Sequence, residues 1–238
     1  MSHQDSRRAG ESSSSSCSCS VFDGGESGAA VVTLVIAHPD DECMFFSPAL
    51  EALRRSGVRT TVCCLSNGDA YGLGRVREKE LQRSCETYGM ARADVEVVED
   101  KRLRDGMDEE WDPAVVVTHV ERHCASVGTT HLLGFDEGGI SGHPNHVACA
   151  QALVRLRSSS RPVWVQRTFG GPSQYLGALQ LLLWHAFGRR KNGVVACTLA
   201  TLVPALRAMR RHDSQLVWYR YLHLLLSRYV YINLLKKL

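Results

Sequence analysis

The chain has 238 residues, of which 44% are hydrophobic and 22% are charged. This composition fits one globular domain with a sizeable core, and it excludes collagen-like, coiled-coil and mostly disordered chains. Residues 1–150 hold 14 Lys and Arg against 24 Asp and Glu, whereas residues 151–238 hold 14 against one acid, Asp213. The basic part is expected either to face an anionic partner, such as a membrane surface or a phosphate, or to dock on the acidic part.

The sequence predicts no membrane-spanning segment and no secretory signal. Residues 1–29 are polar and rich in Ser and Gly, so we expect them to be disordered. No run of about 18 uncharged apolar residues exists that could form an ordinary transmembrane helix. The nine cysteines are odd in number and form no C-x-x-C pair, which favours a reducing compartment over a disulfide framework or a zinc ribbon.

Between residues 30 and 167, short apolar runs alternate with amphipathic stretches. The predicted elements, in chain order, are strand 31–36, helix 42–56, strand 60–65, helix 75–88, strand 95–98, helix 113–126, strand 130–134, helix 144–157 and strand 162–167. Strands that alternate with helices of this length form parallel sheets whose two faces are covered. The pattern therefore predicts an α/β fold of Rossmann-like type, with a three-layer parallel sheet, in one domain over residues 30–238.

Residues 171–238 differ from the rest, and we predict that this basic region is helical and faces a membrane. Residues 176–187 are rich in leucine, and residues 216–238 mix aromatic, leucine and basic residues. Such a mixture is typical of helices at a membrane interface, although it would also suit helices that complete the core. The residues expected in an interfacial belt are Trp218, Tyr219, Tyr221, Tyr229 and Tyr231, together with Arg220, Arg228, Lys236 and Lys237.

Two motifs rich in acidic residues and histidine each follow a predicted strand. AHPDDE (residues 37–42) follows the first strand, and FDEGGISGHPNH (residues 135–146) follows the fourth. Because functional residues of open parallel sheets gather at the carboxyl ends of the strands, we expect the two loops to meet. The chain has neither a G-x-S-x-G elbow nor a G-x-x-x-x-G-K-[ST] phosphate loop, which disfavours serine hydrolases and nucleotide-binding enzymes.

The two loops would bring together the ligands of a metal ion. His38 and Asp41 lie in one turn, and His143 and His146 share one face at the start of a helix. Two imidazoles and a carboxylate around one ion are typical of catalytic zinc, and Asp40 would remain beside it as a free carboxylate. Taken singly, an aspartate that caps a helix or an exposed pair of histidines is the simpler explanation, but the coincidence favours a metal.

With these motifs the sequence resembles the zinc-dependent LmbE/PIG-L family of N-acetylglucosaminyl deacetylases, from residue 31 to the C-terminus. VIAHPDDECMFFSPAL, RVREKELQRSC and SQLVWYRYLHLLLSRYVYIN resemble the eukaryotic branch that acts on N-acetylglucosaminyl-phosphatidylinositol. The resemblance implies a zinc-dependent hydrolase that removes the N-acetyl group of this glycolipid, in the second step of glycosylphosphatidylinositol (GPI) anchor synthesis. It also implies a place on the cytoplasmic face of the endoplasmic reticulum membrane.

The resemblance also assigns roles to residues of this chain. His38, Asp41 and His146 fall on the zinc-ligand positions of the family, and other divalent metals such as iron, cobalt or manganese suit the same donor set. Asp40 falls on the general base, and His143 on the histidine that stabilises the developing oxyanion. The residues expected near the site, around the ligands or the substrate, are Arg77, Glu80, Asp105 and Asn145.

Members of the family typically begin with a hydrophobic anchor, whereas residues 1–30 are polar here. Either this chain starts differently or its C-terminal helices alone hold the membrane. Two other classes are a soluble deacetylase of a thiol sugar or chitooligosaccharide, and a non-catalytic zinc protein on a membrane. The apolar, basic C-terminal region disfavours the first, and the presence of both Asp40 and His143 disfavours the second. No recognisable motif for binding nucleic acid accompanies the positive charge.

Overall fold

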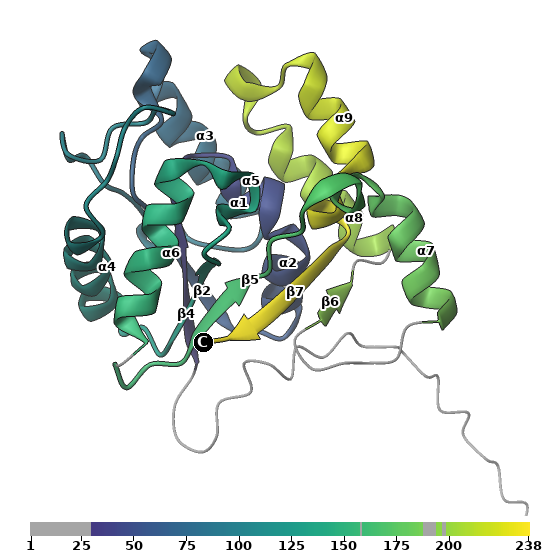
Figure 1. Cartoon of the computed structure of the whole chain (residues 1–238), viewed down its shortest axis with the longest axis horizontal. Coiled ribbons are helices and arrows are strands. Elements are labelled where there is room, and N and C mark those ends of the chain that lie inside the picture. Colours follow the sequence, from purple (N-terminus) through teal and green to yellow (C-terminus); the bar gives the residue numbers. More distant parts are fainter. Residues whose placement is uncertain (1–29, 158, 188–193, 197–198) are drawn as a thin grey trace, which may run out of the picture.

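The computed structural model describes residues 30–157, 159–187, 194–196 and 199–238 (Figure 1). The disorder expected for residues 1–29 lies outside these ranges. The described strands form a seven-stranded sheet in the order β3-β2-β1-β4-β5-β7-β6. The strands are β1 (Val31–Ile36), β2 (Arg59–Cys64), β3 (Val95–Val97), β4 (His131–Phe135), β5 (Val163–Gln166), β6 (Val194–Ala196) and β7 (Ile232–Lys237).

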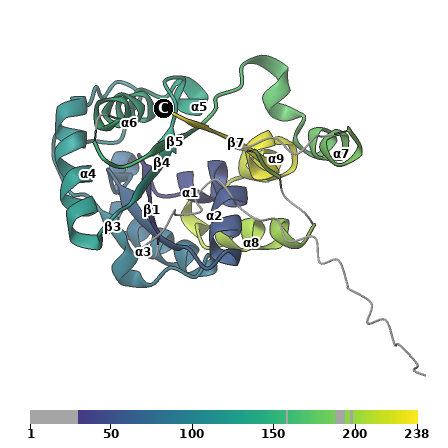
Figure 2. The same ribbon diagram turned by 90° about the horizontal axis from the view of Figure 1, so that it is seen from below.

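Helices cover both faces of this sheet, as the sequence predicts. The helices are α1 (Asp41–Phe45), α2 (Ser47–Arg55), α3 (Gly74–Thr87), α4 (Pro113–Val127), α5 (Gly139–Gly142), α6 (Pro144–Leu156), α7 (Gly177–Phe187), α8 (Leu199–Met209) and α9 (Trp218–Leu226). Figure 2 shows α4 and α6 on one face and α1, α2 and α3 on the other, where α8 packs against all three. The three-layer α/β fold is therefore confirmed.

Strand β1 lies at the centre of the sheet and positions the first motif. All six of its residues are buried, since both faces of the strand are covered by helices, and this explains why VVTLVI is apolar throughout. It pairs in parallel with β2 on one side and with β4 on the other. The strand order therefore reverses between β1 and β4, and the crevice at such a reversal is where α/β sheets bind ligands.

The predicted helix over residues 42–56 is in fact two helices, α1 and α2, that break at Phe46. Pro48 has no N–H to donate to the carbonyl of Met44, so a continuous helix cannot run through it. The C-terminal region binds the carbonyls freed by the break. His223 donates to Met44 O at 3.2 Å, and the amide of Asn233 donates to Phe45 O at 2.8 Å. The break thus becomes the seat of the C-terminal region.

Two details differ from the predicted parallel sheet and helical C-terminal region: one edge of the sheet is antiparallel, and residues 232–237 form a strand. Helix α9 ends at Leu226, and β7 then runs antiparallel to both β5 and β6. The apolar run that follows residue 222 suits a helix and a strand alike, so its local pattern does not decide between them. Tyr229 and Tyr231 of the expected interfacial belt are buried in the core, whereas Trp218, Tyr219 and Tyr221 are exposed on α9.

Candidate metal centre

The loop after β1 is a tight turn that aims two aspartates into the crevice. Asp41 opens α1, and its Oδ2 accepts the backbone N–H groups of Ala37 at 3.1 Å and His38 at 2.8 Å. Asp40 has a φ of 119°, a backbone conformation that costs a non-glycine residue about 1–3 kcal/mol. Its N–H donates to Glu42 Oε2 at 3.1 Å, and its side chain does not cap the helix. The simpler explanation of Asp40 as a helix cap is therefore excluded.

The loop after β4 orients His146 through its backbone. His146 Nδ1 donates to the carbonyl of Gly139 at 3.0 Å, which leaves Nε2 as the nitrogen that faces the crevice. The turn needs positive φ values of 56° at Gly139 and 61° at Ile140. Thr168 holds it, since its hydroxyl accepts the N–H of Ile140 at 2.8 Å while Asp136 accepts the N–H of Thr168 at 2.7 Å. A Cβ at Gly139 would lie 3.1 Å from His146 Cβ, so glycine suits this position.

His38, Asp41 and His146 converge on one point, with one ligand atom of each within 4.8 Å of the others. His146 Nε2 lies 3.2 Å from Asp41 Oδ1, and His38 Nδ1 lies 3.8 Å from Asp41 Oδ2. His146 Nε2 is buried and has no hydrogen-bond partner among the described residues. Two imidazole nitrogens, one of them without a hydrogen bond, and a carboxylate fit the donor set of a divalent metal such as zinc.

Neighbouring side chains fix the orientation of His38. Its Nε2 lies 3.0 Å from Asn145 Oδ1 and 3.1 Å from Asp105 Oδ1, so Nε2 carries the proton and Nδ1 stays free toward Asp41. Asn145 is itself held, because its amide nitrogen donates to Glu109 O at 2.8 Å. Supporting contacts of this kind commonly orient the histidine ligands of metals. The structure thus places both Asn145 and Asp105 against a candidate ligand.

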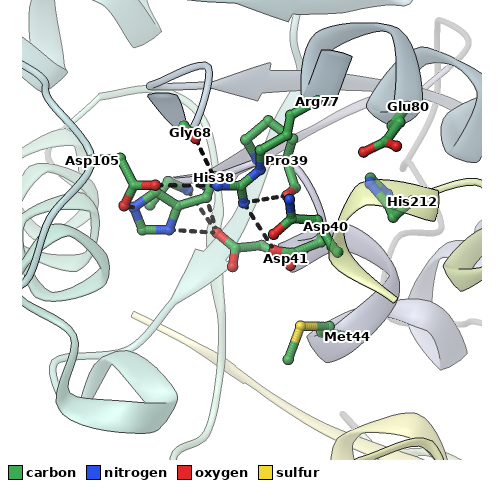
Figure 3. A network of polar contacts seen from close by, with 12 residues as sticks. His38, Pro39, Asp40, Asp41, Met44, Gly68, Arg77, Glu80, Asp105 and His212 are labelled. Carbon is green, nitrogen blue, oxygen red and sulfur yellow. Dashed lines mark hydrogen bonds and ion pairs between the residues drawn. The ribbon is translucent and has the colours of Figure 1, made fainter. Parts of the chain in front are cut away.

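Arg77 connects the loops around the candidate site, and Figure 3 shows its guanidinium between Asp105 and the turn after β1. It donates to Pro39 O at 2.8 Å, to Gly68 O at 2.8 Å and to Asp105 Oδ2 at 3.2 Å. These acceptors come from the loops after β1, β2 and β3. Arg77 therefore positions three loops relative to one another.

Asp40 forms a separate carboxylate beside the three candidate ligands. Its Oδ2 accepts a hydrogen bond from Arg220 at 2.6 Å, and its Oδ1 lies 3.8 Å from Arg77 Nη2. Burial raises the pKa of Asp40 above its usual value, while the charges of Arg220 and Arg77 act in the opposite direction. Asp40 is therefore a carboxylate that can exchange a proton, and Arg220 and Arg77 are the two cations that favour its ionised form.

His143 caps the start of α6 and presents one N–H to the crevice. Its Nδ1 accepts the backbone N–H of Asn145 at 3.2 Å, so the proton of the neutral ring lies on Nε2. The ring centroid lies 4.8 Å from that of His38 and 5.1 Å from that of His146. Burial and the charges of these two rings lower the pKa of His143 to about 4. A neutral imidazole of this kind can donate a hydrogen bond to a developing negative charge.

Comparison with known proteins decides the family. Residues 33–156 match the PIG-L family, described as GlcNAc-PI de-N-acetylase. The chain belongs to the PIG-L family. It is 38% identical over 213 residues to the "Probable N-acetylglucosaminyl-phosphatidylinositol de-N-acetylase" of Schizosaccharomyces pombe. The match covers 87% of this chain and 86% of the relative. It is 35% identical over 211 residues to the N-acetylglucosaminyl-phosphatidylinositol de-N-acetylase of Bos taurus, with 87% and 83% covered.

Solved structures agree on the fold. The N,N'-diacetylchitobiose deacetylase from Pyrococcus horikoshii superposes with a TM-score of 0.63 at 15% sequence identity, covering 88% of this chain and 84% of that one. At this level of identity the likeness establishes the α/β architecture alone.

Glu80, unlike the other residues expected near the site, lies against the C-terminal region of this PIG-L family chain. Both oxygens of Glu80 bind Ser214, one accepting its N–H at 2.7 Å and the other its hydroxyl at 2.6 Å. Ser214 lies in the short 3-10 helix η5 (Asp213–Gln215) between α8 and α9. Glu80 therefore contacts the C-terminal region rather than any of the three candidate ligands, and Figure 3 shows it on the far side of Arg77 from Asp105.

Sequence reasoning missed a buried ion pair behind Asp40. His212 Nε2 donates to Glu42 Oε1 at 2.7 Å, and both side chains are fully buried. Burial alone would raise the pKa of Glu42, but the charge of His212 together with hydrogen bonds from His212 and Ser84 holds the pKa below its usual value. Glu42, Cys43 and His212 form another group that could hold a metal, although Glu42 and His212 already pair with each other. The glutamate that ends AHPDDE and stands in the first turn of an apolar helix was the available signal for Glu42.

A polar cavity opens beside the candidate metal centre of this PIG-L family chain. It has a volume of about 810 Å³ and lies between the loop after β2 and residues 98–109. Asp105 lines this cavity and also contacts His38. The cavity therefore adjoins the candidate metal centre through Asp105.

Proposed function

We propose that this chain is a metal-dependent deacetylase that hydrolyses the acetamide of N-acetylglucosaminyl-phosphatidylinositol. The products are glucosaminyl-phosphatidylinositol and acetate, in the second step of GPI-anchor biosynthesis. The observation that carries the proposal is the convergence of His38, Asp41 and His146 beside the separate carboxylate of Asp40, in a chain of the PIG-L family. We propose zinc as the metal, because a site of two histidines and one carboxylate with open positions is typical of catalytic zinc.

The geometry supports a defined role for each side chain. A divalent cation bound by His38, Asp41 and His146 would polarise the acetyl carbonyl and lower the pKa of a water molecule. Asp40 accepts the proton of the water that attacks the carbonyl carbon, and returns it to the amine as the C–N bond breaks. His143 donates its Nε2–H to the carbonyl oxygen, on which negative charge develops. The residues thus divide between binding, proton transfer and charge stabilisation.

Acetate release from the glycolipid tests this activity. We expect the purified chain to release acetate from N-acetylglucosaminyl-phosphatidylinositol, to lose this activity on chelation, and to regain it when zinc is added back. Full activity in protein shown by elemental analysis to be free of metal would contradict the proposal. Activity only on water-soluble N-acetylglucosaminides would instead support the soluble class of deacetylase. Stoichiometric zinc without any acetate release would support the non-catalytic class.

An exposed apolar surface lies at the C-terminal side of the molecule, on α7, α9 and the 3-10 helix η4 (Gly171–Tyr175), which adjoin one another. Figures 1 and 2 both place α7 and α9 on the side of the sheet away from α4. The exposed residues are Tyr175, Leu176, Leu179, Leu182, Leu183, Val217, Trp218, Tyr219, Tyr221, Leu222, Leu225 and Leu226. None of the helices in the described ranges is long and apolar enough to cross a bilayer.

We infer that this surface rests on the membrane that contains the glycolipid, and we propose the cytoplasmic face of the endoplasmic reticulum. Exposed aromatic and leucine side chains in one contiguous patch are typical of proteins that bind a membrane interface. The same helix α9 that carries Trp218 and Leu225 also carries Arg220, which contacts Asp40. Membrane contact and the candidate site therefore share one helix.

Vesicle binding tests the apolar surface. We expect the double variant Trp218→Ser/Leu225→Ser to bind vesicles of phosphatidylcholine and phosphatidylinositol roughly tenfold more weakly than the unaltered chain. The variant lacks two apolar side chains whose transfer from water into the membrane would stabilise binding. Val154→Ser removes a similarly exposed apolar side chain from α6 and should leave partitioning unchanged. Sedimentation of the protein with the vesicles measures both. Equal partitioning of the double variant and the unaltered chain would show that the surface has another use.

A further inference from the structure

Two arginines near the candidate site point at the same aromatic ring. Arg167 follows β5, and Arg228 opens the 3-10 helix η6 (Arg228–Val230) after α9. The guanidinium carbon of Arg228 lies 3.7 Å from the ring centroid of Phe169, and that of Arg167 lies 5.7 Å from the same centroid. The fold thus gathers two cations from segments 61 residues apart around one phenyl ring.

No carboxylate of the described residues neutralises this pair. Within the described ranges neither guanidinium forms an ion pair with a carboxylate, whereas Arg77 and Arg220 both do. Arg228 is half-buried, and its Nε is buried without a hydrogen-bond partner in that part of the chain. Burial lowers the pKa of Arg228, Tyr229 acts in the opposite direction, and the charge of Arg167 adds to the lowering. Two like charges brought together, one of them partly desolvated, are unfavourable unless an anion joins them.

The position of the pair is intermediate between the candidate metal centre and the exposed apolar surface. On one side, Tyr229 accepts the N–H of Phe169 at 2.9 Å, and its ring lies 5.9 Å from that of Phe45. The Phe45 ring in turn lies 5.8 Å from that of His146. On the other side, η6 packs against both η4 and α7, which carry exposed apolar side chains. A ligand that spans these three places would have a polar end, an anionic middle and an apolar end.

We propose that Arg167 and Arg228 bind a phosphodiester, that of the phosphatidylinositol part of the substrate. This inference rests on the proposed function, whose glycolipid has the required order of groups. Its acetamido sugar would lie at the metal centre, its phosphate at the two arginines, and its acyl chains at the apolar surface. Arginine suits this task because its planar fork binds phosphate oxygens in pairs and keeps its charge when partly buried.

A matched pair of water-soluble substrates tests the role of the arginines without a membrane. One is N-acetylglucosaminyl-inositol, and the other is the same compound with glycerophosphate on the inositol. We expect Arg228→Gln and Arg167→Gln each to lower the ratio of kcat/KM for the phosphate-bearing compound to that for the phosphate-free compound by about 10- to 100-fold, the usual effect of a hydrogen bond to a charged group. The loss should appear mainly in KM. Arg228→Lys should retain part of the preference.

The control is Arg157→Gln, which removes an exposed positive charge at the end of α6. It should leave the substrate ratio unchanged. If the Arg228 and Arg167 variants lose activity on both compounds in equal proportion, the pair is structural and the proposal is wrong. A ratio that stays at the level of the unaltered chain in both variants would equally overturn it. Circular dichroism of each variant identifies any that fail to fold, and Arg228→Lys then carries the test.

Binding without turnover separates this inference from the proposed function. Calorimetry with glycerophosphoinositol, myo-inositol and inorganic phosphate should show that only the first binds tightly, and that Arg228→Gln weakens it. Equal binding of inorganic phosphate would assign the site to free phosphate and overturn the lipid assignment. If the chain binds glycerophosphoinositol through these arginines yet releases no acetate from the glycolipid, the proposed function fails and the phosphate site stands. If the chain releases acetate from the glycolipid but does not bind glycerophosphoinositol through these arginines, the proposed function stands and the phosphate site is wrong.

Discussion

The variant Asp41→Asn is expected to lose its metal, with an affinity more than about 100-fold below that of the unaltered chain. Residues that merely support metal ligands already cost 10- to 100-fold when removed, and Asp41 is placed as a ligand itself. Its Oδ2 is occupied by the N–H groups of Ala37 and His38, while Oδ1 faces His146 Nε2. An asparagine must therefore turn its NH₂ either toward two N–H donors or toward the metal.

Elemental analysis after dialysis, with competition by a chromophoric chelator, measures this loss. Asp108→Asn is the matched control. Asp108 is exposed, and its substitution makes the same chemical change away from the three candidate ligands. It should retain both metal and activity. An Asp41→Asn variant that binds zinc as tightly as the unaltered chain would contradict the assignment of Asp41.

The variant Asp40→Asn is expected to keep its metal and to lose turnover by about 10²- to 10⁴-fold, the usual contribution of a positioned acid or base. Asn has nearly the same shape as Asp and can still accept a hydrogen bond from Arg220, which lies 2.6 Å from Oδ2. It cannot accept a proton from water. Single-turnover rates together with metal content separate the two effects. Full turnover in zinc-loaded Asp40→Asn would show that another group takes the proton.

Arg220→Met provides the complementary variant. Burial raises the pKa of Asp40, and the charge of Arg220 opposes this rise, so removal of that charge should raise the pKa further. A base with a higher pKa is protonated, and therefore inactive, up to a higher pH. The acidic limb of the pH profile of kcat should consequently move to higher pH in Arg220→Met. A limb that does not move would indicate that Arg220 acts on Asp40 by contact alone.

The site residues that the sequence predicts are those that belong to short sequence motifs. An apolar run followed at once by AHPDDE places His38 and Asp41 at the end of a buried strand, and G-H-x-x-H places His143 and His146 at a helix start. Parallel pairing alone then brings the two loops to one edge. The expected meeting of the two loops agrees with the observed pairing of β1 with β4 and with the three ligand atoms that lie within 4.8 Å of one another.

The remainder depends on tertiary contacts that leave no local pattern. Arg220 lies 180 residues from Asp40 in the chain, and its sequence surroundings suit an interfacial helix as well as a site. Glu80 has the sequence context of a site residue, yet it binds Ser214 in the C-terminal region. Strand β7 forms because β5 and β6 offer it two edges, which an apolar run cannot reveal. Long-range pairing therefore decides what periodicity leaves open.

X-ray absorption at the zinc edge of the metal-loaded chain tests the central claim most directly. If His38, Asp41 and His146 hold the ion, the spectrum will contain two imidazole nitrogens and a carboxylate oxygen at about 2.0–2.2 Å, and no sulfur. The variant His146→Ala will lose one of the imidazoles. A sulfur neighbour at about 2.3 Å would instead place the ion at Cys43, beside Glu42 and His212. That result, or a spectrum unchanged in His146→Ala, would contradict the account.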